Sequence, residues 1–213
     1  MAVYDLEEQE QLAALRAYWK QYGNLILTAI TLALAVLAAF QAWNYYQRRQ
    51  AQEASSVYGA LQKAQAGRDA KQVKDLAGTI LERYPGTYYA AMAALISAKS
   101  AYDSGDAKSA KAQLEWVGEH AKSEEFRYIA RLRLAGILLD EKDFDGAMRI
   151  AEGKSNQAFA ARFADLKGDI LAAQKKNAEA RAAYAAAVSA TDAKDAAFRK
   201  YVQQKLDSLG DAS

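Results

Sequence analysis

The chain has 213 residues, of which one is histidine, one is proline and none is cysteine, and its net charge is +2. This small charge, spread among residues of both signs, argues against a nucleic-acid-binding surface, and the lack of cysteine excludes disulfides, thiolate catalysis and cysteine-based zinc sites. Frequent alanine and few runs of β-branched residues predict an all-α protein.

Residues 1–20 form a short polar tail that begins with an acidic run from Asp5 to Glu10. Acidic runs of this size are more often solvated than bound to a partner. The second half of the tail carries Leu12, Leu15 and Trp19 on one face of a helix. We therefore expect this part to continue the next helix along the membrane surface.

The next segment is a predicted membrane span. No charged residue occurs between Lys20 and Arg48, and the apolar centre runs from Leu25 to Trp43. A helix of this length extends about 28 Å, close to the ~30 Å thickness of the hydrocarbon core. Aromatic and basic residues flank it on both sides, as at headgroup levels. The pattern predicts a transmembrane helix over 21–47.

Two other interpretations of the apolar segment are open. A cleaved signal peptide has a shorter apolar region that ends in small residues, whereas bulky aromatic residues follow this segment, so we interpret it as an uncleaved anchor. A buried helix of a globular core is seldom free of charge for this length. The basic residues on the two sides are balanced, and charge alone does not fix the orientation.

One face of the span consists of small side chains at steps of three and four residues. In lipid, small residues let helices approach closely, so this face is a candidate contact for another helix. Alanine is also common in membrane helices, and the segment has no GxxxG motif. The residues of this small-residue face are Thr28, Thr31, Ala35, Ala38 and Ala42.

From about Ala51 onward, amphipathic segments of about 12 to 16 residues alternate with short polar turns, which is typical of paired-helix repeats. Tetratricopeptide repeats place a small residue on the first helix opposite an alanine on the second, where the two helices cross. Pairs with a spacing of twelve are Ala98 and Ala110, Ala135 and Ala147, and Gly168 and Ala180. They recur 37 and 33 residues apart, near the repeat length of about 34. Residues 48–213 are predicted to form a tetratricopeptide-like α-hairpin solenoid.

Both ends of the array differ from its middle. A degenerate helix pair is predicted over 57–65 and 73–83, closed by Tyr84-Pro85, because proline cannot continue a helix. A terminal capping helix is predicted from Ala196 to Leu209, since end repeats need a cover for their last apolar face. Its inward-facing residues are Phe198, Val202, Leu206 and Leu209. Smaller or charged residues replace the usual large ones at Ala94, Arg131 and Ala164.

The sequence offers little for catalysis. His120 lies near a predicted helix end, where a surface or C-terminal capping role is the simplest interpretation. Gly153-Lys154-Ser155 resembles the end of a phosphate-binding loop, but Met148 stands where the motif needs glycine. No metal-ligand spacing is present. We therefore predict a protein that is not an enzyme and has no cofactor or metal.

The first helices of such repeats line a concave groove that can hold an extended peptide or another protein. The register predicts groove positions at Met92, Lys99, Tyr102, Ile129, Leu132, Arg162, Asp165 and Asp169. Tyr102 and Arg162 are the best candidates, because an aromatic residue and an arginine suit interface anchors. Met92, Ile129 and Leu132 are equally compatible with the core.

The acidic start, the single span with its exit AWNYYQ, and the segments RLRLAGILLDEKDFDGAM and FADLKGDILAAQKKNAEARAAYAAAV resemble the YfgM family over nearly the whole chain. Members are ancillary subunits of the bacterial SecYEG translocon with a tetratricopeptide-like periplasmic domain. The resemblance implies an inner-membrane protein with residues 1–20 in the cytoplasm, 21–47 in the lipid bilayer and 48–213 in the periplasm. It implies SecYEG subunits, exported polypeptides and periplasmic chaperones as partners.

These observations favour a non-catalytic, membrane-anchored scaffold at the secretion channel, where tethering raises the local concentration of weakly bound partners. The alternative is a regulatory protein that conveys envelope stress through its cytoplasmic tail, and deletion of residues 1–15 separates the two. A membrane-bound enzyme is a third hypothesis, which requires a secluded carboxylate pair with perturbed protonation in a deep pocket.

Overall fold

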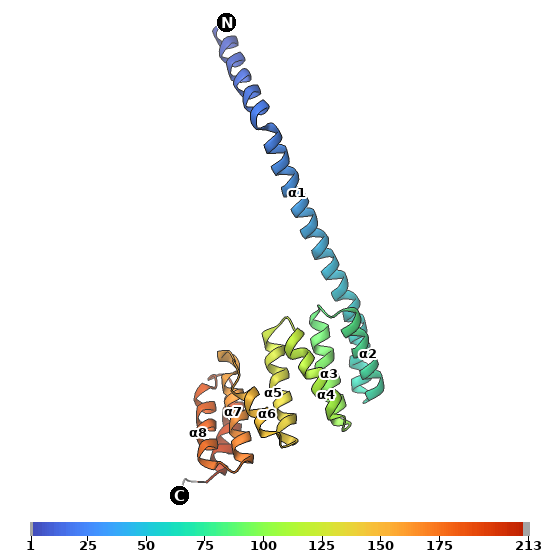
Figure 1. Cartoon of the computed structure of the whole chain (residues 1–213), viewed down its shortest axis with the longest axis vertical. Helices are drawn as coiled ribbons and strands as arrows, with labels where there is room; N and C mark the ends of the chain where they lie inside the picture. The colour runs from blue at the N-terminus through green and yellow to red at the C-terminus, as the bar shows by residue number, and fades with distance from the viewer. Residues whose placement is uncertain (1, 211–213) are drawn as a thin grey trace. The chain divides into compact units, whose positions relative to one another are not determined.

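The computed structural model describes residues 2–210, with only the backbone of residues 2–7 and 9. Asp5 and Glu7 of the acidic run therefore lie outside the described side chains. Every regular element in the described range is a helix, which confirms the predicted all-α class (Figure 1). The helices are α1 (Ala2–Ala66), α2 (Ala70–Arg83), α3 (Tyr88–Asp103), α4 (Ala107–His120), α5 (Glu124–Asp140), α6 (Phe144–Ala151), α7 (Gln157–Ala173), α8 (Asn177–Ala190) and α9 (Ala196–Ser208).

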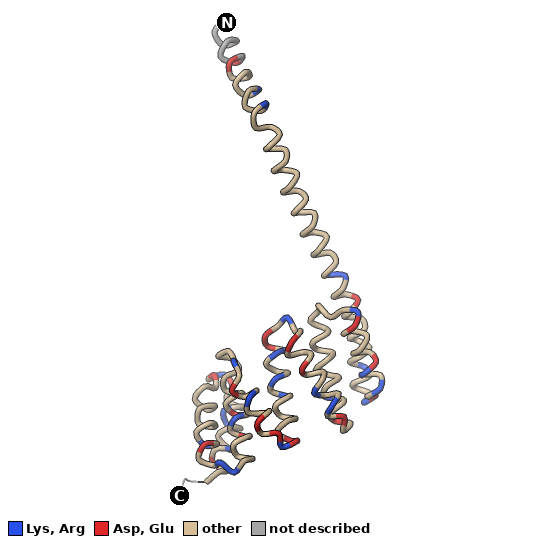
Figure 2. Tube along the Cα trace, in the orientation of Figure 1, with Lys and Arg blue, Asp and Glu red and all other residues tan. Residues whose placement is uncertain are grey.

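The chain divides into two compact units, residues 1–50 and residues 51–213. The described part of the first unit belongs to α1 alone, and its stretch between Lys20 and Arg48 is free of charge (Figure 2). An 18-residue window here has a mean hydropathy of 2.3, and none of it is buried. A core helix would bury these apolar side chains, so their exposure argues against that interpretation and favours contact with lipid.

Helices in the second unit begin at polar residues that satisfy a free backbone N–H group. In each case the side chain accepts a hydrogen bond from the backbone N–H three residues later, the usual N-cap arrangement. The N-cap residues of this kind among those described are Asp69, Thr87, Asp106, Ser123, Asp143, Asn156 and Asp195. Lys176 before α8 makes no such bond. These short polar residues explain where the long alanine-rich stretches divide into separate helices.

The turns inside the hairpins share one backbone conformation. Arg68, Gly105, Lys142 and Lys175 all have positive φ, and they lie 37, 37 and 33 residues apart. The next N–H in each turn closes a Schellman motif, for example from Asp106 to the Ala101 carbonyl at 2.9 Å. The predicted polar turns between paired helices are confirmed at these four positions. The turn at Arg68 joins the end of α1 to α2, which form a first hairpin of the same type.

The predicted small residues lie where the paired helices cross. Every alanine of the three pairs is buried, and a Cβ atom on Gly168 would lie 2.4 Å from the Tyr184 ring. The close crossing of α7 and α8 therefore requires glycine here. In the first hairpin the equivalent positions hold Leu61 and Val73, which are also buried. Its helix pair is confirmed although the small-residue signal is absent.

Four apolar clusters follow one another along the second unit, each shared by neighbouring hairpins. This arrangement is that of a solenoid, in which each repeat contacts its neighbours. The last cluster is covered by α9, where Val202 is fully buried. The other three predicted inward-facing residues pack against the same cluster: Phe198, Leu206 and Leu209. The predicted capping helix is confirmed.

One helix is shorter than predicted, because α6 has only eight residues. Its last turn is capped by Arg131 of α5, which donates a hydrogen bond to the Ile150 carbonyl at 3.0 Å and another to the Lys154 carbonyl. The Arg131 guanidinium also lies 4.9 Å from the centre of the Phe163 ring. Arginine at this position, a departure from the usual repeat, thus gives a charged donor to the last turn of the shortened helix and to the loop that follows it.

Arg131→Ala is expected to destabilise the second unit by about 1.5–3 kcal/mol, because two carbonyls lose a charged donor. Arg133→Ala is the matched control on the same helix, since its single hydrogen bond, to the Leu95 carbonyl, is 3.5 Å long. That variant is expected to change stability by no more than about 0.5 kcal/mol. Thermal unfolding followed by circular dichroism measures both, and equal losses would contradict the capping role.

Candidate protein-binding surfaces

A cavity of about 370 Å³ lies between α3 and α5 on the face where the groove was predicted. Its lining includes Lys99, Tyr102, Arg133, Gly136 and Asp140. Two of the predicted groove residues, Lys99 and Tyr102, are therefore brought together here. The cavity presents an aromatic ring, hydrogen-bonding groups and charges of both signs, which are the components of a polypeptide-binding surface.

Tyr102 is anchored across this cavity. Its hydroxyl donates a 2.5 Å hydrogen bond to Asp140, while 39% of the residue remains exposed. The hydrogen bond to Asp140 raises the pKa of Tyr102 above its ordinary value, because ionisation would remove the donor and place two negative charges side by side. The ring is thus held in place and remains partly exposed to solvent.

The other groove candidates in α3 and α5 are less available. Lys99 pairs with Asp103 one turn later, and both side chains are largely exposed. Met92 is half-buried. Ile129 and Leu132 are also half-buried and pack against the apolar clusters of α3 to α5 and α5 to α7. Their contacts are those of core side chains, the second of the two interpretations left open by the sequence.

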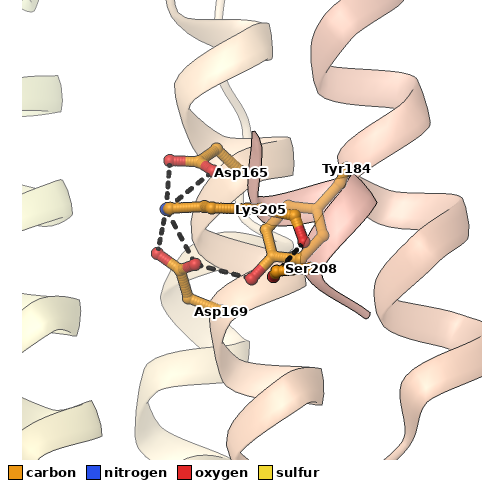
Figure 3. A network of polar contacts seen from close by, with 5 residues as sticks. All are labelled: Asp165, Asp169, Tyr184, Lys205 and Ser208. Atoms are coloured by element: carbon orange, nitrogen blue, oxygen red, sulfur yellow. Dashed lines mark hydrogen bonds and ion pairs between the residues drawn. The ribbon is translucent and has the colours of Figure 1, made fainter. Parts of the chain in front are cut away.

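The three groove candidates on α7, in the last hairpin, contact α9. Arg162 forms a 2.8 Å ion pair with Asp195, and its guanidinium lies 4.3 Å from the centre of the Phe198 ring. Asp165 and Asp169 both bind Lys205, at 2.9 Å and 2.8 Å (Figure 3). These side chains are therefore occupied by the chain's own terminal helix.

The two aspartates, Lys205 and Tyr184 form a polar network beneath α9 (Figure 3). The Tyr184 hydroxyl donates to Asp169 at 2.7 Å. Burial raises the pKa of Asp165, and the hydrogen bond from Lys205 offsets part of this effect. Burial alone would lower the pKa of Lys205, but hydrogen bonds to Asp169 and Asp165 raise it above its ordinary value. Lysine therefore stays charged and holds the carboxylate pair.

This pair bears on the enzyme hypothesis, which requires two secluded carboxylates. Asp165 is buried, yet Lys205 contacts both oxygens of each aspartate, and Tyr184 contacts Asp169 as well. The carboxylates are engaged inside the fold rather than directed at a substrate cavity. Within residues whose side chains are described, no group of three acidic or histidine side chains is placed to bind a metal ion.

His120 is the last residue of α4, as the sequence indicated. Its Nδ1 lies 3.0 Å from the Trp116 carbonyl, and its ring stacks on the Trp116 ring. It is exposed and pairs with neighbours on its own helix. This is the local environment of a helix-terminal residue, where a donor to the last carbonyls is stabilising.

The small-residue face of the span is exposed along its whole length. Thr28 and Thr31 donate their hydroxyl hydrogens to the carbonyls of Asn24 and Leu27, each at 2.8 Å. These hydroxyl groups are therefore satisfied inside the helix. Another helix packing here would meet a smooth surface of methyl groups rather than free hydrogen-bond donors.

Three important side chains did not emerge from the sequence: Lys205, Tyr184 and Asp140. Lys205 and Asp165 are 40 residues apart, and no local pattern links them. Asp140 lies 38 residues after Tyr102, about one repeat length. Stacking the first helices in register could therefore have paired these two residues, whereas the register carries no information about α9.

Stacked α-hairpins with small residues at the crossings and a capping helix define a protein of the tetratricopeptide class, with one long apolar helix that is a candidate membrane span. A family model described as a tetratricopeptide repeat-like domain matches residues 16–211. No solved structure matches the chain.

Three similar proteins are each named ancillary SecYEG translocon subunit. The protein from Neisseria gonorrhoeae is 31% identical over 96% of this chain and 98% of its own length. The one from Haemophilus influenzae is 28% identical over 80% and 83%, and the one from Escherichia coli is 25% identical over 98% and 99%. The chain therefore belongs to the family of ancillary SecYEG translocon subunits.

Proposed function

We propose that the protein is a non-catalytic scaffold that is anchored beside the SecYEG translocon and links exported polypeptides to periplasmic chaperones. The observation that carries this proposal is the makeup of α1, which supplies both the apolar span and the first helix of the repeats. A chain built this way keeps a polypeptide-binding solenoid attached to a bilayer. The names of the relatives support the translocon as the site of action.

The proposed topology has residues 1–20 in the cytoplasm, 21–47 in the bilayer and 48–213 in the periplasm. Protease added to spheroplasts is then expected to degrade the repeats, while intact cells protect them. Repeats that stay intact in spheroplasts and are cut only after detergent lysis would reverse the orientation. They would also exclude periplasmic chaperones as partners.

The proposed contact surface is the cavity around Tyr102. A photoreactive amino acid in place of Tyr102 is expected to cross-link in intact membranes to channel subunits, exported polypeptides or chaperones, because an exposed, anchored aromatic side chain suits an interface. Glu115 on α4 is the matched control, as it is exposed but lies outside the lining of the cavity. Equal labelling from both positions, or none from Tyr102, would count against the surface.

Deletion of residues 1–15 separates the scaffold from a stress regulator that acts through its tail. The scaffold is expected to keep its cross-links from Tyr102 after this deletion, since span and repeats are unchanged. Loss of those cross-links together with an altered envelope-stress response would favour the regulator.

A further inference from the structure

The surface beneath α9 carries charged side chains that a terminal capping helix does not require. A cap has to cover apolar side chains, and apolar contacts alone do this. Here α7 instead contributes Asp165, buried, and Asp169, half-buried. Buried carboxylates cost free energy unless a cation arrives with good geometry. The surface therefore discriminates between covering helices, because only one with a cation at the right position satisfies it.

The covering helix α9 buries fewer side chains than the neighbouring α8, and polar contacts add to its packing against the last apolar cluster. Val202 is its one fully buried side chain among the described residues, whereas α8 buries four. The remaining attachments include the Lys205 pairs, the Arg162 pair with Asp195, and a 2.7 Å bond from Arg199 to the Thr191 carbonyl. Elements with few buried apolar contacts open at lower free energy than the core. Local detachment of α9 thus requires less free energy than unfolding of the whole second unit.

The helix also leaves part of its site unfilled. A cavity of about 750 Å³ remains between the start of α7, the end of α8 and the start of α9. Its lining includes Arg162, Thr191 and Phe198. A helix with larger side chains at its beginning would have room in this cavity. The site is therefore not shaped for α9 alone.

We propose that the α7–α8 surface beneath α9 is a second binding site, which accepts an amphipathic helix from another polypeptide and is occupied by α9 as an internal competitor. The partner helix presents what α9 presents at successive turns: an aromatic residue, an aliphatic residue four positions later and a lysine three positions after that, as Phe198, Val202 and Lys205 do. Such i, i+4, i+7 anchors are typical of a helix bound in a groove. The site is separate from the Tyr102 cavity and does not depend on the function proposed for it.

The test uses the full-length chain in detergent micelles and a fluorescent peptide with the sequence of residues 191–210. Val202→Ala weakens α9 while leaving the α7–α8 surface unchanged, so this variant is expected to bind the peptide about tenfold more tightly than the unmodified chain. Fluorescence anisotropy measures the affinities. Circular dichroism checks that the variant keeps its helix content. If Val202→Ala unfolds the unit, Lys205→Gln serves as a second variant that weakens α9.

Two matched controls report on the lysine. A peptide with Lys205→Ala, and a chain with Asp165→Asn and Asp169→Asn in addition to Val202→Ala, are each expected to lose most of the binding. The proposal is overturned if neither control lowers the affinity for the peptide. It is also overturned if the peptide binds to neither of the two variants with a weakened α9. Dimerisation of Val202→Ala without peptide, measured by light scattering, overturns it as well, because the occupant would then be α9 of a second copy.

Discussion

Arginine at both Ile30 and Leu37 is expected to release the protein from membranes. The two residues are exposed and, at 100° per residue, lie together on the side of the helix away from the small-residue face. Each arginine near the centre of a span costs about 2.5–3.5 kcal/mol on insertion scales, and each lost aliphatic side chain removes a few tenths more. The double variant therefore loses roughly 6 kcal/mol of insertion free energy. Alkaline carbonate extraction measures the fraction that stays in the membrane.

Leu12→Arg with Leu15→Arg is the matched control for this variant. These leucines are also exposed on α1, but they precede the uncharged stretch, so the pair is expected to leave most of the chain in the membrane fraction. The comparison separates insertion from general effects of added charge. A doubly substituted span that resists extraction as well as the unmodified chain would show that residues 21–47 are not the anchor.

Gly168→Ala is expected to destabilise the second unit by about 1–3 kcal/mol. The added methyl group would overlap the Tyr184 ring, whose hydroxyl holds Asp169, so either the helices separate or the ring moves and the hydrogen bond is lost. Alanine has the higher helix propensity, which by itself favours the variant by about 0.5–1 kcal/mol. Steric overlap is expected to exceed this gain.

Gly118→Ala in α4 is the control for Gly168→Ala. Nothing lies within 4 Å of a Cβ atom at Gly118, so only the propensity gain remains and this variant is expected to be more stable than the unmodified chain. Thermal unfolding by circular dichroism should shift in opposite directions for the two substitutions. A shift of the same sign for both would mean that close helix crossing does not constrain residue 168.

The hairpins could be predicted from the sequence because their signals are local. A turn residue, an N-cap and a small residue twelve positions from an alanine all lie within one unit, and the three middle hairpins contain all of them apart from a capping side chain before α8. The first hairpin shows the limit of this reasoning. Leu61 and Val73 replace its small residues, so the sequence predicted it only as a degenerate pair, from its apolar segments and the closing Tyr84-Pro85. The turn at Arg68, 37 residues before the next one, shows that it belongs to the same series.

The groove was harder to predict, because its lining depends on which helix lies beside each unit. Tyr102 faces an open cavity since α5 lies next to α3 there. Arg162 and Asp165 stand on the first helix of the last unit, which has no following hairpin, and α9 takes that place. The sequence predicted both the groove and the cap. Combining them would have assigned these two side chains to contacts with α9.

The capping helix α9, with its buried Val202, ends the stack of hairpins. Each hairpin in a solenoid offers one apolar face to the next, and a face left bare at the end could be satisfied only by a different molecule. Contacts of that head-to-tail kind do not close on themselves, and they lead to fibres or, for chains confined to one bilayer, to extended two-dimensional clusters. By folding α9 over its own last face, the chain closes this route to head-to-tail association.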